Sequence, residues 1–384
     1  MNIKAFVALF AVVFGVQLGT GVVAPLMPIY ADTMGASGLW LGIMFSGYAL
    51  SRLMFMPVMG RLSDSTGRKR FMISGILAYA VVSLFYALAS NIYELTFIRF
   101  LHGLASCAVI PIAQAYIGEL TPNGKEGTYI NLFSMSMFLG MGFGPLLAGT
   151  MTEYFYMNAT FYAMSGLSTL ALFLLLLLVP STKAPSQLSG KSQRTPFLTI
   201  VRDNKVKGVF IFRASRAFWR QGTVAFLPIL VASTMHMSEA DIGLLLSAYL
   251  VTGGVAQGFV GPLADRCNKL VLLIICSIAS PGLLFLIPFM HSGKILLAIL
   301  IPTALIGAIA RGTAMTLNVE MGKQYKAMGT IMGTFASASS LGMVAGPVVF
   351  GYVMDMIGVN WTFELGAAVG VIGGFITAYY FLHR

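Results

Sequence analysis

The chain has 384 residues, of which 57% are hydrophobic and only 10% are charged, and its mean hydropathy is +0.84. Soluble domains carry roughly 25% charged residues, so a soluble enzyme or binding module is excluded. The net charge of +11 would suit a nucleic-acid partner only if the cations gathered on one face of a soluble module. They are instead spread between apolar segments, so we expect a polytopic membrane protein and no nucleic-acid partner.

Clusters of charged and turn-forming residues divide the chain into twelve apolar segments. A helix needs about 20 apolar residues to cross a bilayer, and each segment is long enough. The segments cover approximately residues 5–30, 39–60, 71–90, 94–118, 127–152, 158–179, 207–232, 240–261, 270–290, 295–318, 327–353 and 360–382. We therefore predict an all-α membrane protein with twelve transmembrane helices.

The distribution of basic residues predicts the orientation of these helices. If the N-terminus lies inside the cell, 17 of the 24 Lys and Arg residues fall in cytoplasmic segments, and Lys294 is the one cation in an outer loop. Loops rich in Lys and Arg stay in the cytoplasm, so both termini are expected there. The protein is expected to be a multi-pass protein of the inner (cytoplasmic) membrane of the cell.

The longest polar connection, residues 180–206, contains Pro, Ser, Gln and several cations. This composition is typical of a flexible linker. We expect it to connect, in the cytoplasm, an N-terminal six-helix half, residues 1–179, to a C-terminal six-helix half, residues 207–384.

The two halves repeat each other at an offset of about 200 residues. Parallel repeats of six helices are used by secondary transporters, so the twelve helices are expected to form two six-helix repeats. The matched positions are Gly60 with Gly261, Leu62 with Leu263, Asp64 with Asp265, Ser46 with Ser247, Tyr48 with Tyr249, Glu119 with Glu320, Gly144-Pro145 with Gly346-Pro347, and Pro28 with Pro228.

The segment from Gly60 to Arg70 packs five charges into eleven residues, Gly-Arg-Leu-Ser-Asp-Ser-Thr-Gly-Arg-Lys-Arg. Glycine favours tight turns and so many charges are not tolerated in hydrocarbon, so we expect a turn between two helices. Asp64 is expected to accept hydrogen bonds from a helix N-terminus or an Arg, and thereby to hold the cytoplasmic side closed in one conformation. The alternative is a loop that only fixes topology. The predicted gating residues are Gly60, Asp64, Gly67, Arg68 and Asp265.

Four motifs resemble the major facilitator superfamily and, within it, the twelve-span drug:proton antiporter group. The resemblance covers essentially the whole chain. It implies two six-helix halves that work by alternating access and export small amphipathic compounds against a proton gradient, as multidrug efflux antiporters do. The motifs are the loop motif at Gly60 to Arg70 with a weaker copy at Gly261 to Lys269, the first-span motif at Leu18-Gly19 with Pro25 and Pro28, the fourth-span motif at Arg99 and Gly103, and the fifth-span antiporter motif at Gly140-x-x-x-Gly144-Pro145.

The charged residues inside the predicted spans are the best indication of the charge of the substrate. All 13 Asp and Glu residues fall in loops or near span ends, so the chain lacks the membrane-embedded acid that many proton-coupled exporters of this group carry. A central Arg costs about 2.5–3.5 kcal/mol to insert, so cations in the spans are expected to face water, backbone carbonyls or a bound anion. The cations in the spans are Arg52, Arg99, Arg213, Arg216, Arg220 and Arg311, with His102 beside them.

Three of these arginines share one helix. Spacings of three and four residues place Arg213, Arg216 and Arg220 on one helical face, which we predict to line the transport cavity. For Arg213 the alternative is snorkelling to the cytoplasmic surface. Arg99 and His102, three residues apart, are candidates for proton coupling. For Arg99 this role is implied by the resemblance of the fourth-span motif, and the alternatives are helix packing or binding of backbone carbonyls. His102 is a candidate because His changes protonation near neutral pH, and a packing histidine is the alternative.

The remaining predicted site residues are polar or aromatic side chains within the spans. For the amides and tyrosines the alternative is packing or hydrogen bonding between helices. The predicted substrate-binding residues are Arg52, Arg216, Arg220, Arg311, Gln17, Tyr48, Asn131, Gln221, Tyr249 and Gln257, and the residues predicted to bend helices or let them approach closely are Pro25, Pro28, Gly140, Gly144 and Pro145.

The sequence offers no motif for catalysis, a metal or a cofactor. The three cysteines lack metal-ligand spacing, and Gly190-Lys191-Ser192 has Pro185 where a phosphate-binding loop needs Gly. We predict a monomeric secondary transporter rather than an enzyme. It would export small amphipathic or anionic organic compounds, with proton coupling left open, and its partners would be that substrate and the lipid bilayer. The alternatives are an organic-anion or phosphate-ester importer or exchanger of the same fold and, in another class, a membrane enzyme or receptor.

Overall fold

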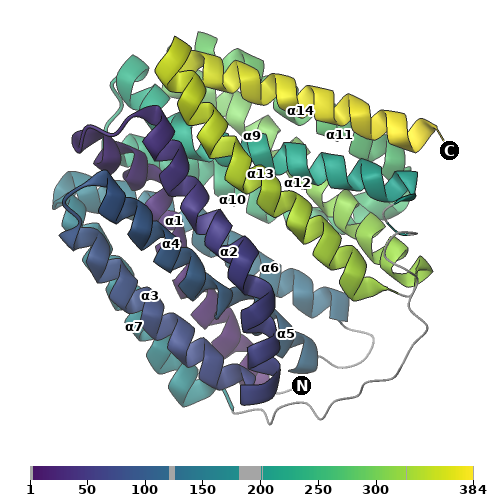
Figure 1. Ribbon diagram of the computed structural model, residues 1–384, viewed down its shortest axis with the longest axis horizontal. Helices are drawn as coiled ribbons and strands as arrows, with labels where there is room; N and C mark the ends of the chain where they lie inside the picture. The colour runs from purple at the N-terminus through teal and green to yellow at the C-terminus, as the bar shows by residue number, and fades with distance from the viewer. Residues whose placement is uncertain (1–2, 121–125, 181–199, 201, 326, 384) are drawn as a thin grey trace. The chain divides into compact units, whose positions relative to one another are not determined.

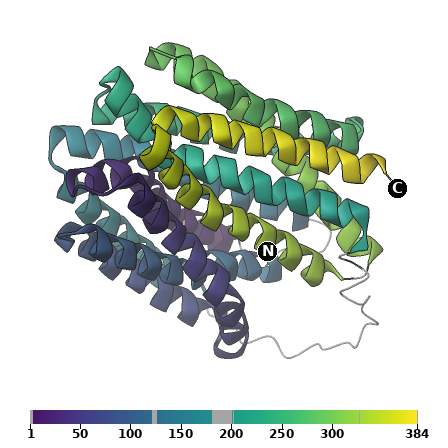
Figure 2. The ribbon, with the colours of Figure 1, turned by 45° about the horizontal axis from the view of Figure 1, so that its top comes forward.

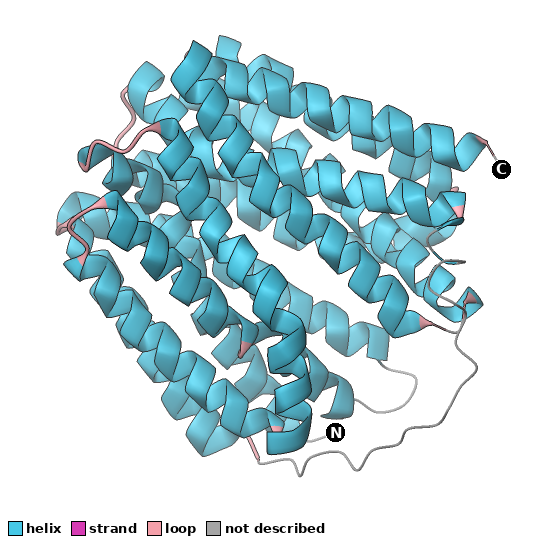
Figure 3. Cartoon of the chain, in the orientation of Figure 1, coloured by secondary structure: helices cyan, strands magenta, loops and turns pink. Residues whose placement is uncertain are grey.

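The computed structural model describes residues 3–120, 126–180, 200, 202–325 and 327–383. These ranges are almost entirely helical and contain no strand (Figure 3). The helices are α1 (Ile3–Thr33), α2 (Gly38–Thr66), α3 (Arg68–Leu88), α4 (Ile92–Cys107), α5 (Ile110–Leu120), α6 (Glu126–Tyr154), α7 (Met157–Leu178), α9 (Asn204–Met235), α10 (Glu239–Arg266), α11 (Lys269–Gly282), the 3₁₀ helix η1 (Leu283–Phe289), α12 (Gly293–Gln324), α13 (Met328–Ile357) and α14 (Val359–Leu382).

Eleven segments of the described chain are long and apolar enough to cross a membrane. One of them, Ile92–Ile117, combines α4 with most of α5, and another, Lys269–Phe289, combines α11 with η1. The predicted span at 207–232 lies in α9, which is 32 residues long but is not among the eleven. Its length is sufficient, and the arginines in its first half lower its hydropathy.

The chain forms two compact units. Unit 1 comprises Met1–Ala36, Ile43–Leu188 and His236–Gly254, and unit 2 comprises Ser37–Gly42, Ser189–Met235 and Val255–Arg384. Each unit therefore includes a short segment from the other half of the sequence. The first turn of α2 belongs to unit 2, and the first half of α10 belongs to unit 1.

Corresponding helices pack in the same way in the two units (Figure 1). In unit 1, α1 packs against α6 and α7, and α3 packs against α7 and α4. In unit 2, α9 packs against α13 and α14, and α11 packs against α14 and α12. Figure 2 shows α9, α13 and α14 running alongside one another. The repeat seen in the sequence is therefore also a repeat of helix packing.

Glycines permit the closest of these helix contacts. A Cβ atom on Gly144 of α6 would lie 2.5 Å from the backbone of Gly21 in α1. A Cβ atom on Gly346 of α13, at the equivalent repeat position, would lie 2.3 Å from the carbonyl oxygen of Phe218 in α9. No side chain fits at such distances, so these helices meet backbone to backbone.

The turn that the sequence predicts between Gly60 and Arg70 is a single residue in the structure. Helix α2 continues to Thr66 and α3 begins at Arg68. Gly67 alone breaks the helical path, with a φ of 96° that glycine adopts without strain. The predicted turn between two helices is thus confirmed, and both helices extend further toward it than the predicted spans do, as α10 also does up to Arg266.

Distant carboxylates cap the first turns of α2 and α10. In unit 2, Asp355 of α13 accepts hydrogen bonds from the backbone nitrogens of Gly38 at 2.6 Å and Leu39 at 2.8 Å. In unit 1, Glu153 of α6 accepts one from the backbone nitrogen of Ala240 at 2.9 Å. Carboxylates satisfy the exposed N–H groups and the positive end of a helix. The two caps occupy equivalent positions of the repeat.

Candidate functional site

Unit 1 gathers a group of side chains from α2, α3 and α4 that we call the tyrosine cluster: Tyr48, Arg52, Tyr79, Tyr86, Arg99 and His102. Arg52 is half-buried and the other five are buried. His102 is fully buried at its centre. The rings of Tyr79, Tyr48 and Tyr86 lie edge-on to its imidazole at centroid distances of 4.7, 5.4 and 5.8 Å. The Tyr86 hydroxyl lies 3.0 Å from His102 Nδ1, whereas Nε2 has no hydrogen-bond partner among the described residues.

The arginines of this cluster contact aromatic rings. Arg52 Nη1 donates to the Tyr48 hydroxyl at 3.3 Å, and that hydroxyl donates to Ser106 Oγ at 3.0 Å. The buried guanidinium of Arg99 lies over the rings of Phe45 and Tyr48, 5.0 and 5.3 Å from their centroids, and its Nε finds no hydrogen-bond partner in the described chain. Cation–π attraction offsets part of the cost of burying these charges.

In unit 2, α9 carries the arginine face predicted from the sequence. Arg213 Nη1 donates to Ser339 Oγ of α13 at 3.4 Å, and Nη2 donates at 3.1 Å to the Asn318 oxygen of α12 when that amide is turned to satisfy both groups. Arg216 Nη2 donates to the Gly307 carbonyl of α12 at 3.2 Å. These two guanidinium groups thus bind polar atoms on neighbouring helices.

Arg220 differs from the other two arginines of α9. It is half-buried, and it makes no hydrogen bond or ion pair with another residue that the structure describes. It lies sixteen residues from the first residue of α9 and fifteen from the last. At 1.5 Å per residue it is about 23 Å from either end of the helix, so it lies at the middle of α9.

Arg311 is the fourth arginine of unit 2 that lies deep in a helix. It is eighteen residues from the start of α12 and thirteen from its end. Its Nε donates to Gln257 Oε1 of α10 at 2.8 Å. The structure therefore brings together two residues that the sequence analysis assigned separately to substrate binding.

Acidic side chains do not accompany these arginines at mid-helix. Every Asp and Glu of the described helices lies within two turns of a helix end. Guanidinium groups pair well with carboxylates and phosphates. A bound anion would therefore supply the negative charge that the middle of the helices lacks.

Other predicted residues lie apart from the tyrosine cluster and the arginines of unit 2. Gln17 is buried where Gly140 of α6 approaches α1, and Tyr249 is buried in α10. Gln221 is half-buried in α9. Pro25, Pro28 and Pro145 are all inside helices. The side chains of Asn131, Asp64 and Asp265, together with Gly60, fall outside the described residues.

Of the predicted gating residues, Gly67 and Arg68 lie within the described chain. Gly67 supplies the break between α2 and α3. Arg68 is buried and its Nη1 donates to Ser63 Oγ at 2.7 Å. Arg68 thus ties the first turn of α3 to the last turns of α2, which fixes the geometry of this connection.

Tyr79, Tyr86 and Ser106 contact the predicted residues but were not themselves predicted from the sequence. Tyr79 and Tyr86 are seven residues apart on α3, so they share a helical face, and this spacing was the available signal. Nothing in the sequence indicates that this face meets His102. That contact depends on how α3 packs against α4.

Comparison with known proteins identifies the family. A model described as Major Facilitator Superfamily matches residues 9–227 and again residues 208–384. The chain belongs to the Major Facilitator Superfamily. It is a multi-pass membrane transporter of that superfamily, and the two matches overlap at residues 208–227.

Several relatives of this major facilitator protein have similar length. A transporter of the same superfamily from Methanocaldococcus jannaschii, itself uncharacterised, is 27% identical over 368 residues and covers 95% of each chain. Multidrug resistance protein 1 of Bacillus subtilis is 24% identical over 359 residues, 93% of this chain and 91% of its own. This facilitator is thus similar along its whole length to a multidrug resistance protein.

Solved structures show the same fold at low sequence identity. A bacterial homolog of the human lysosomal transporter Spinster, inward-facing and occupied, superimposes with a TM-score of 0.81 at 12% identity, covering 99% of this chain and 96% of that one. The human organic anion transporter MFSD10 gives a TM-score of 0.71 at 15% identity, covering 97% and 99%. These similarities establish the major facilitator fold of the chain.

Proposed function

We propose that this major facilitator protein is a monomeric secondary transporter of the inner (cytoplasmic) membrane that exports small amphipathic or anionic organic compounds by alternating access. It would have twelve spans, with α9 as the seventh, and both termini in the cytoplasm. Its two sequence halves, 1–179 and 207–384, would be joined by a cytoplasmic linker at 180–206. Similarity to a multidrug resistance protein over nearly the whole chain supports efflux.

The observation that carries the choice of an anionic substrate is Arg220. A guanidinium at the centre of a membrane helix costs about 2.5–3.5 kcal/mol to insert, and Arg220 has no described partner to offset that cost. Arg216 lies one turn away on the same face. We assign both residues to binding of a carboxylate or phosphate, with Arg311 and Gln257 as a second polar contact from α12 and α10.

In unit 1, Arg52 and Tyr48 are the proposed substrate contacts. Arg99 and His102 are the proposed coupling residues, since His102 retains an unpartnered Nε2 among the described side chains and the acid of the same helix, Glu94, lies in its first turn. Transport measurements would distinguish a proton carried by His102 from a proton carried by the substrate. The roles of Gly60, Asp64, Gly67, Arg68 and Asp265 in closing the cytoplasmic side remain proposals from the motif.

The membrane potential supports export as the direction of transport for an anion. With the cell interior negative, moving a monovalent anion outward gains about 2.3 kcal/mol per 100 mV of membrane potential. Export of an anion therefore needs no further driving ion. The second candidate, supported by the same arginines, is an importer or exchanger of organic anions or phosphate esters, which would need a co-transported proton or a counter-transported anion.

Transport by purified protein in proteoliposomes tests the substrate class. Fluorescein and ethidium serve as anionic and cationic aromatic probes. We expect transport of fluorescein, and we expect Arg216→Ala and Arg220→Ala to abolish it while leaving the amount of inserted protein unchanged. Transport of ethidium that neither substitution affects, with no transport of fluorescein, would show that the arginines do not select the substrate.

A further inference from the structure

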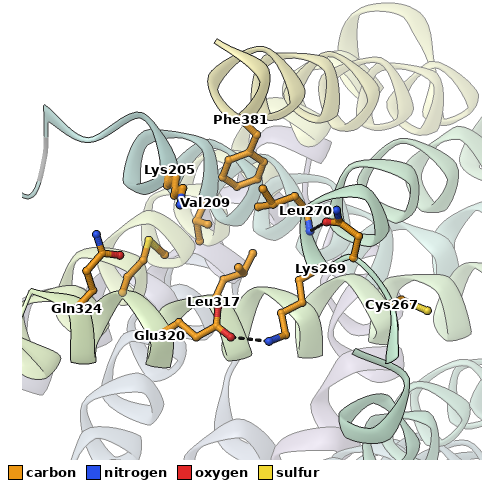
Figure 4. Close-up of a pocket in the computed structure, with 11 residues that line it drawn as sticks. Lys205, Val209, Cys267, Lys269, Leu270, Leu317, Glu320, Gln324 and Phe381 are labelled. Atoms are coloured by element: carbon orange, nitrogen blue, oxygen red, sulfur yellow. Dashed lines mark hydrogen bonds and ion pairs between the residues drawn. The ribbon is translucent and has the colours of Figure 1, made fainter. Parts of the chain in front are cut away.

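Unit 2 contains a pocket of about 330 Å³ at the end where α9 and α11 begin and where α12 and α14 end (Figure 4). We call it the basic end pocket. It is remote along the helices from Arg220 and Arg311, which lie at mid-helix. Its charged and amide lining residues are Lys205 of α9, Asn268 and Lys269 at the start of α11, and Glu320 and Gln324 of α12.

The basic end pocket lies where three candidate membrane spans have an end. Lys269 begins one span, Gln324 ends another and Leu382 ends a third. The pocket also has apolar walls. Val209, Leu317 and Phe381 line it and are buried members of the hydrophobic core of unit 2.

Cations predominate among the charged groups of the pocket, with two lysines against one glutamate. Lys269 Nζ lies 2.5 Å from Glu320 Oε1, an ion pair drawn as a dashed line in Figure 4. Asn268 Oδ1 accepts from the backbone nitrogens of Leu270 and Val271 at 3.1 and 3.4 Å. Asn268 thus caps the helix, and the ammonium groups of Lys205 and Lys269 are the cations of the pocket.

We propose that the basic end pocket binds the phosphate of an anionic phospholipid, with Lys205 and Lys269 facing the phosphate and the acyl chain lying along the apolar wall at Leu317 and Phe381. Basic pockets between membrane helices hold acidic headgroups at this depth. Glu320 competes with the phosphate for Lys269. The pocket is thus a lipid site separate from the proposed transport site, and its occupancy ties α9, α11, α12 and α14 together at this end.

Glu320 provides a test that separates lipid binding from a purely structural ion pair. Lys269→Ala and Glu320→Gln both break the ion pair, so a purely structural ion pair would change the stability of the protein in the same direction in both variants. Lipid binding predicts that the two substitutions change the affinity for the phospholipid in opposite directions. Loss of Lys269 should weaken binding of the phospholipid about fivefold, because one lysine near a charged membrane surface contributes about that factor to the affinity. Loss of the Glu320 charge should strengthen the binding.

The experiment measures the melting temperature of the purified full-length protein in detergent during titration with phosphatidylglycerol, with phosphatidylcholine of the same acyl chains, and with glycerol 3-phosphate. We expect phosphatidylglycerol to stabilise the protein more than the other two. Lys205→Ala and Lys269→Ala should weaken this effect and Glu320→Gln should strengthen it. Lys207→Ala is the matched control, because Lys207 lies 5.7 Å from the Tyr380 ring at the same end of the unit but does not line the pocket.

Four results would overturn the proposal. Equal stabilisation by phosphatidylcholine would show that the negative charge is not recognised. Equal stabilisation by glycerol 3-phosphate would assign the pocket to a soluble phosphate ester. Weaker binding in Glu320→Gln would indicate a zwitterionic headgroup or a structural ion pair. An effect of Lys207→Ala as large as that of Lys269→Ala would indicate nonspecific attraction to the surface.

Discussion

Replacing Arg220 by Met should make the protein more stable and less active. In the native chain the guanidinium lies about 23 Å from either end of α9 and has no described partner. A fully lipid-exposed Arg there would cost about 2.5–3.5 kcal/mol. Because the side chain is half-buried within the protein, only part of this cost applies, and we expect Arg220→Met to stabilise the protein by about 1–2 kcal/mol.

The same substitution should weaken binding of an anionic substrate. A hydrogen bond to a charged group contributes about 1.5–3 kcal/mol, which corresponds to roughly a 10- to 150-fold change in Kd. The assay is the melting temperature of purified protein in detergent, with and without fluorescein. Without ligand, Arg220→Met should melt at a higher temperature than the wild type, and the stabilisation by fluorescein should be lost.

Two controls make this prediction specific. Arg220→Lys keeps the charge and should retain part of the fluorescein effect. Arg213→Met should lower the melting temperature, because it leaves Ser339 and Asn318 without their charged partner. A lower melting temperature for Arg220→Met, or an undiminished fluorescein effect, would refute the assignment of Arg220 to anion binding.

Three further predictions follow from the packing, the caps and a titrating side chain. Gly144→Ala should destabilise the protein by about 1–3 kcal/mol through overpacking, whereas Gly166→Ala, which has open space around the new methyl group, should not; equal melting temperatures would contradict this. Asp355→Asn should weaken the cap on α2 by roughly 1 kcal/mol or less, measured as faster amide hydrogen exchange at the start of that helix, and unchanged exchange would show that the cap is dispensable. Burial and the hydrogen bond that its hydroxyl donates to Asp203 raise the pKa of Tyr325 to about 12. The contribution of the protonated hydroxyl to the stability of the fold is therefore complete below pH 10 and is lost as the pH rises toward 12. The melting temperature should fall more steeply over this range for the wild type than for Tyr325→Phe, and parallel curves would show that Tyr325 does not cause the fall.

The helices could be predicted because each needs only a local property, an apolar run long enough to cross a bilayer. Glycine and charge between Gly60 and Arg70 predict a turn, and the structure has one at Gly67. These signals do not give the residue at which α2 ends, because both glycine and charged residues also occur in the last turns of a helix. The exchange of short segments between units 1 and 2 was not predictable, since it depends on contacts between distant parts of the chain.

In the candidate site, too, local spacing could be predicted and contacts between helices could not. Spacings of three and four residues predict that Arg213 and Arg216 share a face, and both reach α12 or its neighbour α13 in the structure. The pairing of Arg311 with Gln257 and the gathering of tyrosines around His102 depend on packing between helices. The sequence shows that these polar and aromatic residues lie within the spans, but it does not show which of them contact one another.

Transport of fluorescein in proteoliposomes, with membrane potential and pH gradient set independently, tests the central claim most directly. The account predicts that fluorescein leaves the negative compartment faster as the potential grows, without a pH gradient, and that Arg216→Ala and Arg220→Ala abolish this movement. Accumulation of fluorescein that requires an inward proton gradient and does not respond to potential in this way would contradict export and favour an anion importer.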